Sequence, residues 1–283
     1  MSYNLIINSS NVGNSLNNLY VYNFIKGSFE IPEGAEIMLT SFQIPYSWYN
    51  ITGRNNNNSF RIYFPTGTST YTLYTVTIPN GFYTTTSLNA FLQQYCITNG
   101  LYLRDSGGNN VYYLSVQYNS TYYANQILAY TVPTSLPAGF TQPSNWVGYP
   151  TTSRTPYIEI INGLNFGTFL GFSPGNYGIN QTANYSINSN ITPVGSTVNS
   201  LVIRCSLVNT NISSTTDIID SFPINGTFGS NLNYLNNIEK WIRLSPGRYN
   251  NFIVTIQDQN LNDINILDNN ILMNFIIRLK NNF

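Results

Sequence analysis

The pattern that most constrains this chain is an alternation of apolar and polar side chains over short runs. Apolar residues recur at every second position from Leu201 to Val208 and from Ile271 to Lys280. Because side chains along a strand point to opposite faces in turn, each run predicts a strand with one buried face. Similar runs, separated by turn residues, lie at 60–64, 71–78, 111–118, 157–161 and 218–223. The sequence therefore predicts an all-β chain.

One predicted strand, Ile37–Tyr46, changes the phase of its alternation part-way along. Ile37 and Leu39 fall on one face, whereas Phe42 and Ile44 fall on the other. Strands that are covered on both sides have apolar residues on both faces. We predict that this strand is buried on both faces at its start and on one face at its end.

Two short helices interrupt the strands. Thr84 and its neighbours can cap a helix start, after which Leu88, Leu92 and Tyr95 share one face and Gly100 can end the helix. A second short helix is predicted between Leu164 and Leu170.

The segment 119–155 differs from its flanks because it is rich in Pro, Thr, Tyr and Gly and has weak periodicity. A structureless loop of this length is unusual inside a compact domain. We predict that residues 119–155 are an outward-facing insertion, and that residues 1–118 and 156–283 form one β domain. An alternative is that 119–155 is only a long surface excursion.

Charged residues make up 8% of the sequence, against about 25% in an average soluble protein. The net charge is zero and no basic stripe is visible, which argues against nucleic acid as a partner. No run is long and apolar enough for a membrane span. The low charge and the 23 tyrosines suggest that much of the surface is buried in an assembly.

The sequence contains few residues that could catalyse a reaction or bind a metal ion. Without histidine, the chain cannot build Ser-His-Asp, Cys-His or His-ligated metal sites, and Cys96 and Cys205 are too few for a four-cysteine zinc site. We therefore expect no enzymatic activity, no cofactor and no metal. Two acids in a cleft would suffice for a glycoside hydrolase, so carboxylate chemistry is the remaining alternative. The acidic groups are Glu30, Glu33 and Glu36; Asp217 and Asp220; and Asp258, Asp263 and Asp268.

Aromatic side chains offer a second alternative, a sugar-binding platform. Most of them lie in alternating runs, where packing is the default interpretation. Trp146 lies in the predicted insertion and is the best single candidate for a surface ligand contact.

Three segments are distinctive in their order along the chain. The first is AEIML followed by QIPYSWYNI, the second is IPNGFY before the predicted helix, and the third is FLGFSPG. Together they resemble the penton (minor capsid) proteins of virophages and Polinton/Maverick-type elements. The resemblance covers most of the chain in order, apart from the segment 119–155. Matching framework positions are Pro45, Trp48, Pro79, Gly81, Tyr83, Leu170 and Gly171.

The resemblance implies a single jelly-roll β-sandwich of about eight strands in two antiparallel sheets. It implies a structural protein that forms homopentamers at the icosahedral vertices of a virion, next to the major capsid protein, and that assembles inside an infected host cell. The outward insertion could contact a host surface glycan. The alternative function is a carbohydrate-binding or host-attachment β-sandwich.

Overall fold

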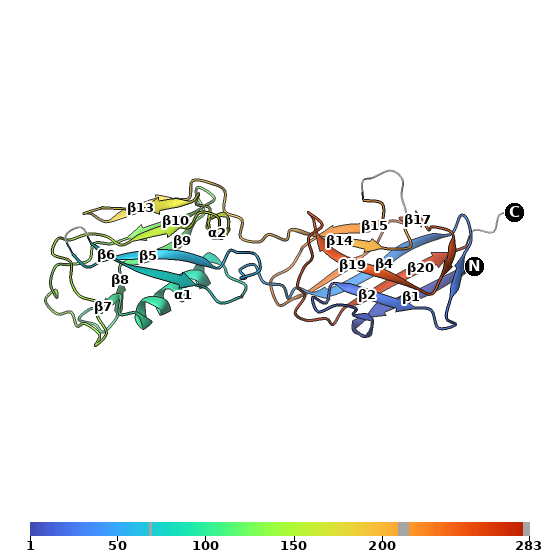
Figure 1. Cartoon of the computed structure of the whole chain (residues 1–283), viewed down its shortest axis with the longest axis horizontal. Helices are drawn as coiled ribbons and strands as arrows, with labels where there is room; N and C mark the ends of the chain where they lie inside the picture. The colour runs from blue at the N-terminus through green and yellow to red at the C-terminus, as the bar shows by residue number, and fades with distance from the viewer. Residues whose placement is uncertain (68–69, 209–214, 280–283) are drawn as a thin grey trace. The chain divides into compact units, whose positions relative to one another are not determined.

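The computed structural model describes all residues except 68–69, 209–214 and 280–283, so Lys280 of the last predicted strand lies outside the described residues. The chain forms two compact units. Unit 1 comprises Met1–Trp48 and Val198–Phe283, and unit 2 comprises Tyr49–Thr197. Both are built mainly of antiparallel strands, which confirms the all-β prediction (Figure 1). Neither described helix is long and apolar enough to cross a membrane.

Unit 1 contains two sheets whose strands follow one another out of chain order. The first sheet runs β1-β20-β4-β16, with the short β17 also pairing with β4, and the second runs β15-β14-β19-β2. Their bounds are β1 Ser2–Asn8, β2 Leu19–Asn23, β4 Glu36–Pro45, β14 Ser200–Cys205, β15 Ile218–Pro223, β16 Asn231–Leu235, β17 Ile242–Arg243, β19 Asn251–Asp258 and β20 Leu272–Arg278. A separate pair joins β3 (Phe29–Ile31) to β18 (Gly247–Tyr249), and a short 3₁₀ turn spans Ser9–Asn11.

The core of unit 1 lies between the inner faces of these two sheets. The rings of Phe42 in β4 and Phe222 in β15 are 5.0 Å apart and nearly edge to face. Side chains from the middle strands are fully buried: Ile37, Leu39, Ile44, Leu201, Ile203, Val254, Ile256, Met273, Phe275 and Ile277. The alternating runs of the sequence therefore supply one buried face to each sheet.

The phase change in β4 is a β-bulge and not a change from double to single burial. Asn274 pairs with Ser41 whereas Phe275 pairs with Leu39, so Thr40 is the extra residue. The Thr40 hydroxyl donates to the Asn274 carbonyl at 3.0 Å. An extra residue shifts the alternation by one position, so Leu39 and Phe42 both face the core. The predicted double burial was wrong, because both apolar sets lie on the same face.

Unit 2 also contains two main sheets. One runs β12-β11-β5-β6, the other runs β13-β10-β9, and a small hairpin joins β7 to β8. Their bounds are β5 Ser59–Pro65, β6 Tyr71–Thr77, β7 Tyr102–Arg104, β8 Asn110–Tyr112, β9 Leu114–Asn119, β10 Ala124–Ala129, β11 Tyr157–Ile160, β12 Gly175–Tyr177 and β13 Tyr185–Asn188. Both predicted helices are present, as α1 (Thr85–Thr98) and α2 (Phe166–Leu170).

Helix α1 covers strand edges of both sheets in unit 2. Thr84 caps its start, and Leu88, Leu92 and Cys96 are buried. Its Asn89 side chain accepts a hydrogen bond from the Val116 backbone N–H of β9 at 3.0 Å. Its Tyr95 hydroxyl donates to the Thr75 carbonyl of β6 at 3.2 Å. The helix thus pairs backbone groups that would otherwise be free at two sheet edges.

The segment 119–155, predicted as an insertion, lies within unit 2 and supplies β10 to one of its sheets. The larger segment that leaves unit 1 and returns to it is Tyr49–Thr197. Unit 2 therefore begins well before residue 119 and ends well after residue 155. Whether any part of this segment faces outward on an assembly stays a prediction.

The side chain of Asn50 forms hydrogen bonds near both ends of unit 2. Its buried side-chain amide donates to the carbonyls of Tyr83 and Gly195, both at 2.7 Å, and its side-chain oxygen accepts from the Tyr83 N–H at 2.8 Å. Gly195 lies close to the last residue of unit 2, and Asn50 close to the first. One side chain therefore links the beginning and the end of a segment of nearly 150 residues.

We expect Asn50→Ala to destabilise the protein by about 3 kcal/mol, because it removes three hydrogen bonds between a buried amide and the backbone of Tyr83 and Gly195, each worth about 1 kcal/mol. The measurement is urea denaturation followed by circular dichroism. Asn80→Ala is the control, since exposed Asn80 accepts one hydrogen bond, from the Gly53 N–H at 2.9 Å. Equal effects of the two substitutions would contradict the role given to Asn50.

Candidate functional site

The first acidic group does not form a site. Glu30 and Glu33 are exposed, whereas Glu36 is buried and its Oε2 accepts a 2.6 Å hydrogen bond from Arg278 Nε. The guanidinium of Arg278 also lies 3.8 Å from the centre of the Trp241 ring. Glu36 thus joins β4 to β20 through a charge-assisted bond, and the three carboxylates do not converge.

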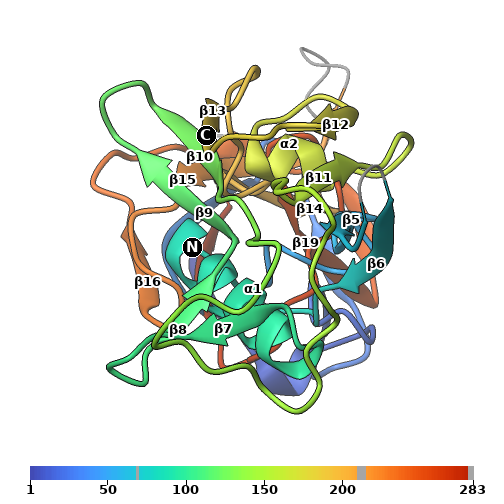
Figure 2. The ribbon, with the colours of Figure 1, turned by 90° about the vertical axis from the view of Figure 1, so that its left-hand side faces the viewer.

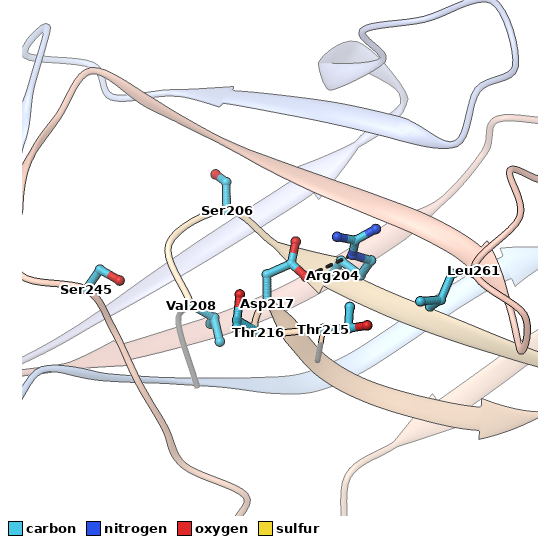
Figure 3. A pocket seen from close by; sticks show the side chains of 8 residues that line it. All are labelled: Arg204, Ser206, Val208, Thr215, Thr216, Asp217, Ser245 and Leu261. Carbon is cyan, nitrogen blue, oxygen red and sulfur yellow. Dashed lines mark hydrogen bonds and ion pairs between the residues drawn. The ribbon is translucent and has the colours of Figure 1, made fainter. Parts of the chain in front are cut away.

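A shallow pocket of about 560 Å³ in unit 1 contains Asp217 (Figure 3). Arg204 lies in it, with its Nε 2.9 Å from Asp217 Oδ1 and its Nη1 2.9 Å from Gln257 Oε1. The remaining lining is hydroxyl and aliphatic: Ser206, Val208, Thr215, Thr216, Ser245 and Leu261. The single carboxylate of this lining is neutralised by an arginine, so the pocket lacks the pair of acids that glycoside hydrolysis requires.

Asp220 joins the edges of the two sheets of unit 1. Its buried carboxylate accepts hydrogen bonds from Lys240 Nζ at 2.9 Å and from the Tyr234 hydroxyl at 2.8 Å. The bond to Asp220 raises the pKa of Lys240, and burial followed by the same carboxylate raises the pKa of Tyr234. Lys240 and Tyr234 therefore both keep their protons at neutral pH and donate to the Asp220 carboxylate, which is a structural arrangement.

The last acidic group is also structural. Asp258 accepts from the N–H groups of Asn260 and Asn262, both at 2.8 Å, and Asp263 accepts from the side chains of Asn18 and Gln257. Asp268 accepts from the Asn270 N–H at 3.0 Å. Within the described residues, no group of three His, Cys, Asp or Glu side chains could hold a metal ion.

The two cysteines are buried free thiols, Cys96 in unit 2 and Cys205 in unit 1. Burial raises the pKa of each thiol to about 12. A thiol that stays protonated at neutral pH is a poor nucleophile. Both residues act as small apolar side chains of the core.

Trp146, the predicted ligand contact, is half-buried against the core of unit 2. Its ring lies 5.9 Å from that of Phe64, 6.4 Å from Tyr113 and 5.2 Å from Tyr149. The indole N–H is buried, and none of the described residues pairs with it. Most of the ring is therefore used for packing, and a ligand contact at Trp146 stays a prediction.

Five of the predicted framework residues lie in two groups, one in each unit. Pro45 ends β4 opposite Asn231, and Trp48 is buried with its ring 4.5 Å from Tyr46. In unit 2, Gly81 forms a β-bridge with Ile51 that is bonded in both directions. The exposed Pro79 precedes that bridge, and Tyr83 follows it to bind Asn50. These residues shape the places where the chain leaves unit 1 and begins unit 2.

Leu170 and Gly171 end helix α2 inside unit 2. Gly171 adopts a left-handed backbone with φ of 88°, and its carbonyl accepts from the Ile191 N–H at 3.0 Å. The Leu170 carbonyl accepts from the Asn125 side chain of β10 at 3.0 Å. Through these two hydrogen bonds, Leu170 and Gly171 connect α2 with β10 and with the segment that leads out of unit 2.

Sequence reasoning missed three exposed tyrosines on the β9–β10 hairpin. Tyr118, Tyr122 and Tyr123 are 49%, 69% and 66% exposed. The signal was present in the sequence as three tyrosines within six residues. We assigned Tyr118 to a packed strand and did not expect a hairpin end there.

No family model matches the sequence, and no curated protein matches it either. The solved structures that are similar to it include the following two. The mavirus penton protein, a selenomethionine-labelled crystal structure, is 10% identical with a TM-score of 0.47, and the match covers 98% of both chains. A chain in the cryo-EM structure of the Sputnik virophage is 14% identical with a TM-score of 0.39, covering 98% of this chain and 96% of that one.

We expect Gly171→Ala to destabilise the protein by about 3 kcal/mol, because a Cβ there adds left-handed backbone strain and would lie 2.8 Å from Ile191 O, Pro193 Cγ and Ser189 Cβ. Gly163→Ala is the matched control, since Gly163 has φ of 82° with nothing within 4 Å of the added Cβ. It should cost about 1 kcal/mol. Equal losses in urea denaturation would show that close packing at Gly171 is unimportant.

Stability should fall as the pH rises above about 10. Burial raises the pKa of Tyr113 to about 12 and also raises the pKa of Tyr20 and Tyr185. Since each folded pKa exceeds the unfolded value of about 10, the stabilisation is complete below pH 10 and is lost as the pH rises toward the folded pKa. The urea midpoint should drop between about pH 10 and about pH 12. Tyr113→Phe should reduce that drop, and Tyr122→Phe, an exposed control, should not.

Proposed function

We propose that this chain is a structural protein of a viral capsid, without enzymatic activity, that assembles as a homopentamer at the icosahedral vertices. In this proposal it contacts itself and the surrounding major capsid protein, and it is found in the virion after assembly inside the host cell. The observation that carries the proposal is the order of the strands in unit 1.

Apart from the short strands β3, β17 and β18, the described strands of unit 1 are β1, β2, β4, β14, β15, β16, β19 and β20, which we number one to eight along the chain. In these numbers the first sheet has the order one, eight, three, six, and the second has five, four, seven, two. Two interleaved Greek keys with this order are the arrangement of a jelly roll, a fold of viral capsid proteins. The order supports a single jelly roll in unit 1, with unit 2 inserted between its third and fourth strands.

The outer face of the first sheet supports burial in an assembly. Ile6 of β1 and Leu272 of β20 are 55% and 38% exposed, and they are diagonal neighbours on that face. Ile276 lies farther along the same face opposite Met38, and both are half-buried. An apolar patch on the outside of a sheet is typical of a surface that another subunit covers. We define these four residues as the outer patch.

The distribution of acids also supports a structural role over a hydrolytic one. Glu36, Asp217 and Asp220 are each bound to a basic side chain in unit 1. Asp258 and Asp263 are occupied by amide donors. The alternative of a carbohydrate-binding or host-attachment protein is favoured by a different feature, the exposed tyrosines of the β9–β10 hairpin, and is compatible with a capsid location.

The experiment is native mass spectrometry of the purified chain together with negative-stain electron microscopy. We expect a particle of five 31.9 kDa chains and rings with five-fold symmetry. A stable monomer under all assembly conditions would contradict the proposal.

Substitutions in the outer patch test whether this surface forms the contact between subunits of the pentamer. Ile6→Glu with Leu272→Glu should shift the particle toward the monomer if this surface is covered, because a buried unpaired charge is costly. Ile25→Glu is the control, since Ile25 is 97% exposed in a loop. If the variant with both substitutions still forms a pentamer, the outer patch is not part of the contact between the five subunits. The pentamer itself would still be established.

A further inference from the structure

Figure 2 shows the β9–β10 hairpin of unit 2. Three exposed tyrosines lie at one end of this hairpin. Asn119 pairs with Ala124, so residues 120–123 form the loop. Tyr122 and Tyr123 belong to this loop, and Tyr118 lies in the last part of β9. The rings of Tyr118 and Tyr123 are 6.4 Å apart at an angle of 84°. We call Tyr118, Tyr122 and Tyr123 the tyrosine tip.

The backbone at the tyrosine tip is strained. Tyr123 has φ of 49°, in the left-handed region where glycine or asparagine is favoured. Of the five described non-glycine residues with positive φ, three are asparagine. Because Tyr123 is two-thirds exposed, burial within unit 2 does not account for a bulky residue at this position. Backbone strain of this kind is concentrated at functional sites, which makes Tyr123 a candidate for one.

The surroundings of the tyrosine tip are polar and uncharged. The sequence holds no charged residue between Asp105 and Arg154. Unit 2 as a whole has six charged residues: Arg54, Arg61, Arg104, Asp105, Arg154 and Glu159. Next to the tip, Gln117 donates to Gln126 at 2.6 Å across the hairpin, and Asn119 donates to Asn188 of β13 at 3.4 Å. These amides offer both donors and acceptors.

We propose that the tyrosine tip binds a neutral oligosaccharide. Flat phenol rings can stack on the C–H faces of pyranose rings while their hydroxyls and the neighbouring amides bind the sugar hydroxyls. The absence of charge matches a ligand that carries none. A stable protein interface buries about 1,200 Å² or more, which three side chains at the end of one hairpin do not provide.

This site does not depend on the proposed pentamer, since the tyrosine tip lies within unit 2 of a single chain. If the chain is pentameric, five copies of the tip would act together on a polysaccharide, and the apparent affinity would exceed that of one site. Loss of sugar binding and loss of pentamers are therefore separate outcomes.

The test is a glycan array that carries neutral hexose and N-acetylhexosamine oligosaccharides next to sialylated and sulfated ones, followed by calorimetry with the best neutral oligosaccharide. The full-length chain should bind neutral glycans. Tyr122→Ser combined with Tyr123→Asn should weaken binding at least about tenfold, because two stacking rings are lost. The melting temperature should stay the same or rise, because asparagine tolerates the left-handed backbone.

Tyr130→Ser is the matched control, since Tyr130 is a 41% exposed tyrosine of unit 2 outside the tip. It should bind as the unchanged chain does. The proposal is overturned if the chain binds no neutral glycan, if it binds only charged ones, or if the tip variant binds equally well. Full binding by the tip variant and loss of binding in Trp146→Phe would place the site at Trp146 instead. Capture of a capsid protein by the tip, with no glycan bound, would also overturn it.

Discussion

The pairing of β4 with β20 is the constraint on which unit 1 depends. β4 pairs with β20 on one side and with β16 and β17 on the other, so it lies inside the first sheet. Its bulge at Thr40 brings Ile37 and Leu39 onto the same face as Phe42 and Ile44. A bulge moves every later side chain of a strand by one position, so its placement decides which residues form the core. The position of the bulge therefore also sets which residues of β4 pair with β20 on one side and with β16 and β17 on the other.

The ion pairs of unit 1 are placed on this framework. Glu36 of β4 binds Arg278 of β20 at one end of their pairing, and Asp220 of β15 binds Tyr234 of β16 and Lys240 beyond it. In unit 2, Arg61 of β5 binds Glu159 of β11, and the neutral side chains of Asn50, Asn89 and Asn125 satisfy backbone groups of distant segments. A buried amide can donate and accept without the desolvation cost of a charge. Both units therefore combine ion pairs between strands with neutral amide side chains, such as Asn18 in unit 1.

Much of the secondary structure could be predicted from the sequence. The runs at 201–208 and 271–280 and the helix after Thr84 were recognisable because each has a regular period and capping or turn residues. The role of β4 was misjudged because a phase change can arise from burial on both faces or from a bulge, and local pattern does not separate the two. The tyrosine tip was overlooked because Tyr118 fits the alternation of β9, and only the position of the turn reveals that the core ends before it.

The sequence by itself determined the β class, the two helices and the lack of histidine chemistry, since these follow from local period and residue type. The tertiary structure alone decided where the chain divides. Tyr49–Thr197 forms a unit of its own because Asn50 meets Gly195 across 145 residues, and no local pattern encodes a contact at that separation. It also decided that the acids do not converge, because Glu36, Asp217 and Asp220 each bind a basic side chain from a different element. Only packing shows which side chains remain exposed.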